Sequence, residues 1–230
     1  MTEKLNKYIE SFESENSDAI RWVAPILRWS IWVNEEANDV LPDVSFVEST
    51  LRRRLSSLAK ISLKVAHDCA DDLQHVHLVY ASRHGDLNRT TQMLVDLAED
   101  QPLSPTTFSM SVLNAFAGVY SIARQIQLPS TSISAGELSF GFGLLEACLQ
   151  LASKPETPVL FVYADEPAPA IYRVLPSENF QPHAIAILLS NEATTKINCT
   201  MMPVEALNPI DTQSQSFIKC LNGKYKHWKS

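Results

Sequence analysis

Three residues with the chemical types of a catalytic triad occur close together in the sequence. Ser82, His84 and Asp86 could supply a nucleophile, a base and a carboxylate that orients the base. All three lie within five consecutive residues after a β-rich run, and side chains so close in sequence cannot easily form a line of hydrogen bonds. The interpretation we favour is a strand-to-helix turn in which Asp86 is the N-cap of the helix.

Two further pairs of side chains have the chemical types of catalytic or metal-binding residues. Asp165 and Glu166 follow a strand-like run, and paired carboxylates can do acid and base work, but no partner for them is identifiable. His75 and His77 would share one face of a strand, as metal ligands sometimes do, yet no third ligand lies near them. The four cysteines are far apart and form no C-x-x-C pair. We expect neither a metal site nor a disulfide framework.

A glycine-rich segment, GELSFGFG at 136–143, invites comparison with a phosphate-binding loop. It lacks the Lys-Ser/Thr pair that would reach the terminal phosphates, and the G-x-G-x-x-G motif is absent. Only 6 glycines occur in the 230 residues. Nucleotide binding is therefore not expected, and no cofactor is predicted.

The charge balance argues against other classes of function. The chain has 19 basic and 26 acidic residues and a net charge of −7, the wrong sign for a protein that neutralises phosphates. Nucleic-acid binding is not expected. The N-terminal residues lack the features of a signal peptide, and no apolar run is long enough to span a membrane. We expect a cytoplasmic protein. The run Arg52-Arg53-Arg54 is interpreted as a solvated helix face or a docking site for an acidic partner.

Alternating strand-like and helical patterns organise most of the chain. Strands are predicted within 21–33 and over 76–82, 130–135, 159–163, 183–190 and 196–202. Helices are predicted over 46–69, from 87 to 97, over 112–124 and over 138–152. The last of these has apolar residues around its whole circumference, so it is expected to be buried on all sides. The order of elements favours an α/β fold with a largely parallel sheet.

The segment 104–151 resembles the nucleophile region of β-ketoacyl synthases, the condensing enzymes of the thiolase-like superfamily. It reads SPTTFSMSVLNAFAGVYSIARQIQLPSTSISAGELSFGFGLLEACLQL. Asn114, Gly118, the Pro129-Ser130 turn and the strand at 131–135 keep the order found in those enzymes. In the same register, the position of the active cysteine falls on Glu137.

A glutamate at that position changes the expected chemistry. A cysteine thiolate at the start of a helix is activated by the helix dipole and attacks an acyl thioester. A carboxylate is electrostatically favourable there but cannot carry an acyl thioester, so Glu137 is interpreted as a structural anion, a relic or a partner contact. Elsewhere in the superfamily an amide at this position gives a decarboxylase, which still needs two histidines. After Glu137 the chain has only His183 and His227, and neither lies in a synthase-like motif.

A more specific resemblance covers roughly 21–202. The segments VHLVYASRHGD, SVLNAFAG and VLFVYADEPAP look like those of short β-ketoacyl synthase-like N-terminal-domain proteins. These are chain-length-factor partners in aryl polyene and related type II fatty-acid-like pathways. Such proteins tend to carry a histidine where this chain has Leu113. The resemblance implies a thiolase-like fold equivalent to the N-terminal half of a synthase, βαβαβαββ, with helices on both faces of the sheet.

The resemblance also implies an organisation and a role. We expect a polar leader at 1–20, one domain at 21–203 and a C-terminal extension at 204–230. The expected function is that of a non-catalytic subunit, which forms a heterodimer with an active β-ketoacyl synthase and contacts acyl carrier protein only indirectly. The alternatives are a malonyl-carrier-protein decarboxylase that uses Glu137, and a homodimeric acyl-binding scaffold.

Two groups of residues would carry that role. Candidates for the wall of the partner's acyl tunnel are Phe108, Met110, Leu113 and Phe116, although core packing is the alternative for each. The strand expected to align antiparallel with its counterpart across the dimer comprises Ser130, Thr131, Ser132, Ile133, Ser134 and Ala135. Because half a synthase fold leaves the helix at 138–152 without its usual cover, residues after Pro203 or another chain must cover it.

Overall fold

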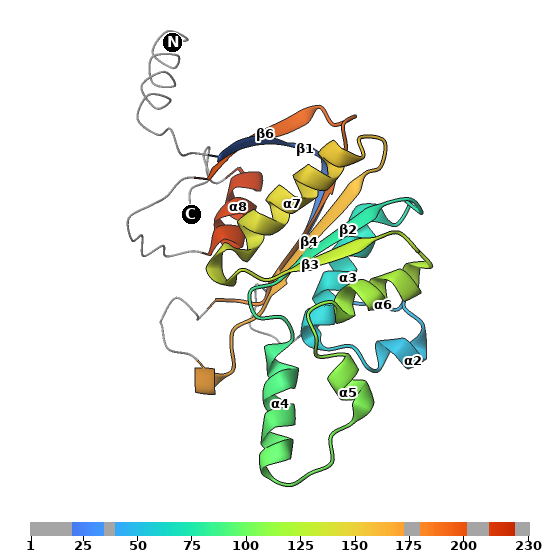
Figure 1. Cartoon of the computed structure of the whole chain (residues 1–230), viewed down its shortest axis with the longest axis vertical. Helices are drawn as coiled ribbons and strands as arrows, with labels where there is room; N and C mark the ends of the chain where they lie inside the picture. Colours follow the sequence, from blue (N-terminus) through green and yellow to red (C-terminus); the bar gives the residue numbers. More distant parts are fainter. Residues whose placement is uncertain (1–19, 35–39, 173–179, 202–211, 224–230) are drawn as a thin grey trace.

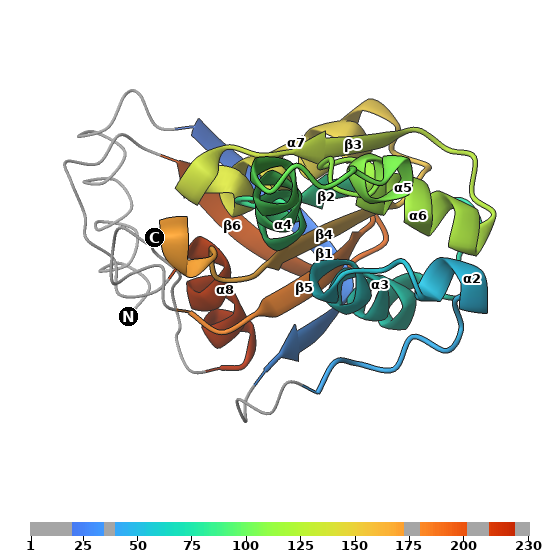
Figure 2. The same cartoon turned by 90° about the horizontal axis from the view of Figure 1, so that it is seen from below.

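The computed structural model describes residues 20–34, 40–172, 180–201 and 212–223. Most of the leader expected at 1–20 and the tail at 224–230 lie outside this part. The described residues form one six-stranded sheet with helices on both faces (Figures 1 and 2). In spatial order the strands are β3 (Ser130–Ile133), β2 (His77–Ala81), β4 (Val159–Asp165), β5 (His183–Leu189), β1 (Ile20–Val33) and β6 (Thr195–Met201). All six strands were predicted from the sequence, although β3 ends at Ile133 and the predicted strand residues Ser134 and Ala135 lie outside it.

Strand directions refine the expectation of a largely parallel sheet. β2 is parallel to both β3 and β4, whereas β5 is antiparallel to β4 and to β1, and β1 is antiparallel to β6. Four strands therefore run in the same direction. Only two of the five pairings are parallel, because β5 lies between β4 and β1. The βαβαβαββ order is present up to β5, and β6 is an additional edge strand.

One face of the sheet is covered by α3 (Ser57–Ala70) and α6 (Ala115–Arg124), whose apolar side chains join alternate strand residues in one core cluster. The single helix predicted over 46–69 is wrong. The chain forms a short α2 (Ser49–Arg52) and then α3, whose N-cap Ser56 accepts a hydrogen bond from the Ala59 amide. Helix α6 begins at Ala115, later than predicted. The segment before it contains a short α5 (Pro105–Ser109).

The other face is covered by α7 (Ser139–Ser153) and α8 (Gln213–Leu221), which lie side by side in Figure 1. The prediction that the helix at 138–152 is buried on all sides is wrong. Phe142 and Leu149 are 38% and 55% exposed on the side of α7 turned away from the sheet. Helix α8 was not predicted. A capping box between Thr212 and Gln215 starts it, and Phe217 anchors it in the core at 1% exposure.

A helical arm extends from the body of the molecule. Helix α4 (Leu87–Ala98) and the short α5 project away from the sheet at the bottom of Figure 1. Only Met93 of α4 is buried, whereas Leu94 and Leu97 are more than half exposed. The arm therefore presents apolar side chains that the other described residues leave exposed. Within the described residues, no helix is long and apolar enough to cross a membrane.

Candidate functional site

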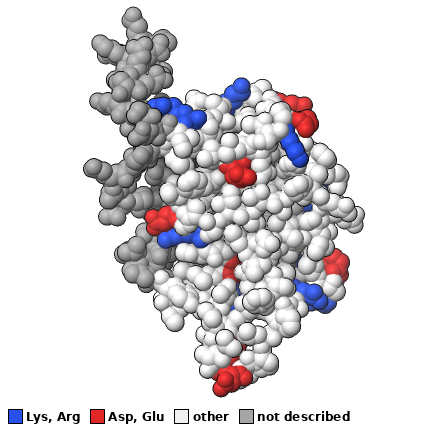
Figure 3. Space-filling model, viewed as in Figure 1, with Lys and Arg blue, Asp and Glu red and all other residues white. Residues whose placement is uncertain are grey.

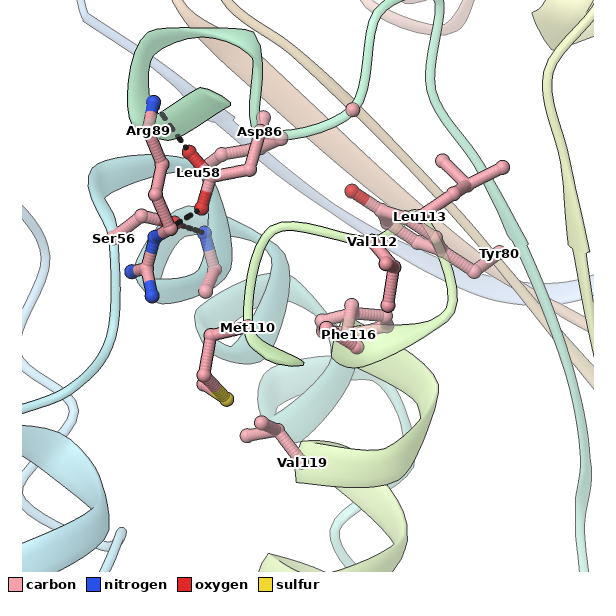
Figure 4. Close-up of a pocket in the computed structure, with 13 residues that line it drawn as sticks. Ser56, Leu58, Tyr80, Asp86, Arg89, Met110, Val112, Leu113, Phe116 and Val119 are labelled. Carbon is pink, nitrogen blue, oxygen red and sulfur yellow. Dashed lines mark hydrogen bonds and ion pairs between the residues drawn. The ribbon is translucent and has the colours of Figure 1, made fainter. Parts of the chain in front are cut away.

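A pocket lies where the carboxyl end of β2 meets α3, α4 and α6 (Figure 4). The start of α3 contributes Ser56 and Leu58, and β2 contributes Tyr80. The segment from the end of α5 into α6 supplies most of the apolar lining, namely Met110, Val112, Leu113, Ala115, Phe116 and Val119. Asp86 and Arg89 lie at one end of the pocket. The remaining lining residues are Ala59 and Gly85.

Three of the four residues predicted for a tunnel wall line this pocket. Phe116 is 5% exposed, and its ring centroid lies 4.4 Å from that of Tyr80. It is therefore a core residue as well as a pocket residue. Met110 and Leu113 are partly buried and pack against the same core. Phe108 does not line the pocket: it lies on α5 and is 61% exposed.

The side chains nearly fill the pocket. Its volume is about 20 Å³, which is room for about one water molecule. The polar groups are committed to local structure, because Ser56 caps α3 and Arg89 Nε lies 3.0 Å from Asp86 Oδ2. Arg89 Nη2 also donates a hydrogen bond of 2.9 Å to the Arg54 carbonyl, which ties α4 to the end of α2. The pocket lining is thus largely apolar, and its acid and base, Asp86 and Arg89, are already paired with each other.

The Ser82, His84 and Asp86 cluster forms a turn, as predicted. Ser82 Oγ accepts a hydrogen bond from the Gly85 amide at 3.0 Å, and Asp86 caps α4 while pairing with Arg89. Gly85 has φ +62°, a conformation that favours glycine. Ser82 and Asp86 are thus bonded to the turn and to α4.

Glu137 lies at the carboxyl end of β3, in a single 3₁₀ turn (Gly136–Leu138) that leads into α7. Its side chain is 65% exposed, and its Oε1 lies 3.3 Å from Arg83 Nη2. Ser139 Oγ bonds the Ala135 amide and the Gly136 carbonyl, so it fixes the turn. The carboxylate is near the start of α7, where the helix dipole favours negative charge. It offers no thiol for an acyl thioester.

The glycines of GELSFGFG serve packing. A side-chain Cβ at Gly143 would lie 2.6 Å from the Phe161 ring, so only glycine lets α7 approach the sheet this closely. The Gly141 amide donates a 3.0 Å hydrogen bond to Gln213 Oε1 at the start of α8. Neither contact is that of a phosphate-binding loop. In the part of the chain that the structure describes, no group of His, Cys, Asp and Glu is arranged to hold a metal ion.

Asp165 and Glu166 are buried, at 1% and 8% exposure. Burial raises the pKa of Asp165 to about 7 and raises the pKa of Glu166. Asp165 Oδ2 accepts a 3.1 Å hydrogen bond from the Tyr163 hydroxyl, and Glu166 Oε1 accepts a 2.8 Å hydrogen bond from Asn88. These carboxyls are bonded inside the protein, so they do not form an acid/base pair open to a substrate.

His183 is buried in β5, and burial lowers its pKa to about 4. Its Nδ1 lies 2.9 Å from the Gln181 carbonyl, and a carbonyl only accepts, so Nδ1 carries the proton of the neutral ring. Its Nε2 therefore accepts the hydroxyl proton of Ser214 at 2.7 Å. This contact joins α8 to the sheet and was not foreseen, because nothing in the sequence pairs Ser214 with a strand residue.

Comparison with known proteins gives a consistent family assignment. The family model for the N-terminal domain of β-ketoacyl synthases matches residues 28–226. No curated protein matches the sequence significantly. Among solved structures, a chain in the complex of the ketosynthase ApeO with its chain length factor ApeC from Xenorhabdus doucetiae is 28% identical, with a TM-score of 0.72 over 93% of both chains.

Two more distant structures share the fold. A β-ketoacyl synthase from Burkholderia phymatum is 12% identical with a TM-score of 0.53, over 67% of this chain and 47% of that one. A chain of the AntDE:AntF complex, a type II polyketide synthase carrier protein with its ketosynthase, is 11% identical with a TM-score of 0.50, over 65% and 51%. This chain thus corresponds to about half of each. Because the family model covers most of the 230 residues, the chain belongs to the family of β-ketoacyl synthase N-terminal domains.

Proposed function

We propose that this chain is a non-catalytic, chain-length-factor-like subunit that pairs with an active β-ketoacyl synthase and shapes the end of its acyl tunnel. The observation that carries the proposal is the similarity, over 93% of both chains, to a chain of a ketosynthase–chain length factor complex. Glu137 at the position of the synthase nucleophile supports the non-catalytic half of the proposal. An aryl polyene or related pathway is the proposed context.

Two neighbouring surfaces are proposed to meet the synthase. Strand β3 is at the edge of the sheet, so one side of its backbone is open to another strand. Helix α7 lies against it, with Gln150 Nε2 2.8 Å from Thr131 Oγ1. The face that bears α7 shows few charged side chains in Figure 3, and Phe142 and Leu149 are exposed on it. A partner strand beside β3 and partner side chains over α7 would bury this surface.

The proposed tunnel wall is the pocket lining. Met110 and Leu113 come from the connection between α5 and α6, which leads from the exposed Phe108 on the arm into the core residue Phe116. An acyl chain that reached this connection from the partner would meet side chains with no free volume behind them, because the pocket holds only about 20 Å³. The wall would therefore stop chain growth by steric exclusion.

Shortening Met110 is expected to lengthen the products of the complex. Met110→Ala removes a partly buried side chain and opens the pocket, at a cost in stability of about 1–2 kcal/mol. The product distribution, measured by mass spectrometry, should shift to longer chains than those of the parent complex. Met110→Leu, which nearly conserves volume, is the control and should leave the distribution unchanged. An unchanged distribution with Met110→Ala would remove Met110 from the tunnel wall.

The decarboxylase alternative receives little support from the described residues. Glu137 is exposed, and His183 is buried with both ring nitrogens bonded to Gln181 and Ser214. His227 lies outside the described residues. A proton-transfer partner for Glu137 is therefore not available from His183.

A further inference from the structure

A line of buried polar side chains lies between the sheet and α8. We define the α8 clasp as Asp165 and Tyr163 on β4, His183 on β5 and Ser214 on α8. Asp165 and His183 are directly opposite each other on the two strands, so their side chains share one face of the sheet. All four side chains are at most 4% exposed. The α8 clasp is therefore buried in the folded protein.

The contacts of the α8 clasp follow one another from strand to helix and back. His183 Nδ1 donates to the Gln181 carbonyl at 2.9 Å, and Ser214 Oγ donates to His183 Nε2 at 2.7 Å. The Tyr163 hydroxyl contacts Ser214 on one side and Asp165 Oδ2, at 3.1 Å, on the other. Because Ser214 gives its only proton to His183, its oxygen can bond Tyr163 only by accepting the phenolic proton.

The protonation state of Asp165 decides whether this line of hydrogen bonds is complete. A protonated Asp165 donates to Tyr163, and each group then donates to the next as far as the Gln181 carbonyl. An ionised Asp165 takes the single proton of Tyr163, so the oxygens of Tyr163 and Ser214 face each other without a proton between them. It also leaves a buried charge whose Oδ1 has no close hydrogen-bond partner among the described residues.

The groups around Asp165 set the pH at which it ionises. Burial is the largest influence and disfavours the ionised form, as does the neighbouring Glu166 carboxyl. The Glu166 amide and the Arg83 guanidinium, from the turn after β2, favour it, but burial prevails and raises the pKa of Asp165 to about 7. His183 stays neutral because burial lowers its pKa to about 4. Tyr80 on β2 also faces Asp165, and burial raises the pKa of its hydroxyl, which stays protonated.

Helix α8 has few other anchors. A helix of nine residues is not stable by itself in water, so it depends on contacts with the rest of the protein. Its buried residues are Ser214, Phe217 and Ile218. At its first residue, Gln213 Oε1 accepts the hydrogen bond from the Gly141 amide of α7. Since Ser214 belongs to the α8 clasp, breaking the clasp removes one of these anchors.

We propose that the α8 clasp is a proton-operated switch, which holds α8 on the sheet while Asp165 is protonated and lets it detach when Asp165 ionises. This inference goes beyond the proposed function and does not rest on it. With α8 detached, Asp165 is open to water and ionises at about pH 4. Docking of α8 is therefore strongest below that pH, weakens as the pH rises, and levels off above about pH 7. Detachment would uncover Phe140 of α7, whose ring centroid lies 5.0 Å from that of Phe217.

Hydrogen exchange of the full chain, followed by mass spectrometry, tests the switch. Protection factors, which correct for the intrinsic effect of pH on exchange, are compared for the peptides that contain α8 and α3. We expect the protection of α8 to fall at least about 10-fold between about pH 5 and about pH 8. At the higher pH, α8 should be at least about 10-fold less protected than α3, because detachment is a local opening.

Two variants separate Asp165 from its neighbour. Asp165→Asn carries an amide that donates to Tyr163 as a protonated carboxyl does, so its α8 should stay protected within about 2-fold at both pH values. Glu166→Gln is the matched control. It removes the adjacent buried carboxyl, which bonds Asn88 and not the α8 clasp, so the fall in α8 protection should remain.

Each other outcome decides against the switch. Unchanged protection of α8 between the two pH values would overturn it, as would a fall in Asp165→Asn as large as in the parent protein. Loss of the pH dependence in Glu166→Gln would assign the titration to Glu166. If Asp165→Asn does not fold, infrared spectroscopy of Glu166→Gln decides. Its protonated-carboxyl band should disappear over the same pH range as the protection of α8, and disappearance while α8 stays protected would overturn the switch.

Discussion

Replacing Ser132 with proline is expected to abolish assembly with the synthase and to leave this chain folded. The Ile133 carbonyl accepts a hydrogen bond from the Ser82 amide at 3.2 Å, so the peptide groups of Ile133 face β2. Backbone groups of successive residues point to opposite sides of a strand, and the Ser132 amide therefore faces the open edge. Proline removes that donor without breaking the ladder to β2, a position where edge strands tolerate it.

The matched control for that prediction is Ser132→Ala, which keeps the backbone amide. We expect the dissociation constant of the complex to rise by about 100-fold or more with proline and by less than about 3-fold with alanine. Size-exclusion chromatography and anisotropy titration measure the complex, and circular dichroism checks that both variants are folded. A proline variant that folds and still binds the synthase would exclude the open edge of β3 from the interface.

Truncating Phe217 is expected to cost about 3–5 kcal/mol of unfolding free energy. This side chain is 1% exposed, and its ring centroid lies 5.0 Å from that of Phe140 on α7. It belongs to the core cluster that α7 shares with the sheet. Because a domain of this kind has about 5–15 kcal/mol in total, Phe217→Ala should consume a large part of the stability. Urea denaturation followed by circular dichroism measures the loss.

Phe108→Ala is the control for this second prediction. The same residue type is truncated, but Phe108 is 61% exposed, so the expected change in unfolding free energy is under about 0.5 kcal/mol. Phe217→Leu should fall between the two. A loss below about 1 kcal/mol for Phe217→Ala would mean that α8 is a peripheral attachment and does not act as part of the cover for α7.

The strands were predictable because their residues alternate or run in short apolar stretches. β4 and β5 are buried along their entire length, which matches the continuous apolar runs at 159–163 and 183–190. The helix at 46–69 was not predicted correctly. Its apolar spacing continues through the arginines, but the Ser56 cap and the hydrogen bond from Arg89 to the Arg54 carbonyl stabilise a break there. The second contact comes from a distant helix, which local periodicity cannot report.

Helix α8 was missed for a related reason. Its stretch is polar on average, and its stability depends on one buried aromatic residue and on the Ser214 contact with His183. The sequence does carry one usable signal, the capping pattern from Thr212 to Gln215. The exposure of Phe142 and Leu149 on α7 was not predicted. Apolar residues around the whole circumference of a helix indicate that the helix can be buried on all sides. They do not indicate whether this chain supplies the cover.

Part of the candidate site was predictable from the family resemblance. Met110, Leu113 and Phe116 line one pocket because they follow one another through a turn and the first part of α6. Phe108 lies on α5, before the turn that carries the other three, and its side chain is 61% exposed on the surface of the arm. The buried hydrogen bonds of Glu166 with Asn88 and of His183 with Ser214 could not be predicted, since these partners come from other elements. The partner of Asp165 is Tyr163, which lies on the same strand, β4.

The central claim is that this chain works as the partner of a synthase, and co-expression with the β-ketoacyl synthase encoded beside it tests this most directly. Native mass spectrometry of the purified material should give a 1:1 complex, and that complex should make products of a different length from those of the synthase alone. A stable homodimer of this chain that leaves the synthase unbound and its products unchanged would contradict the account.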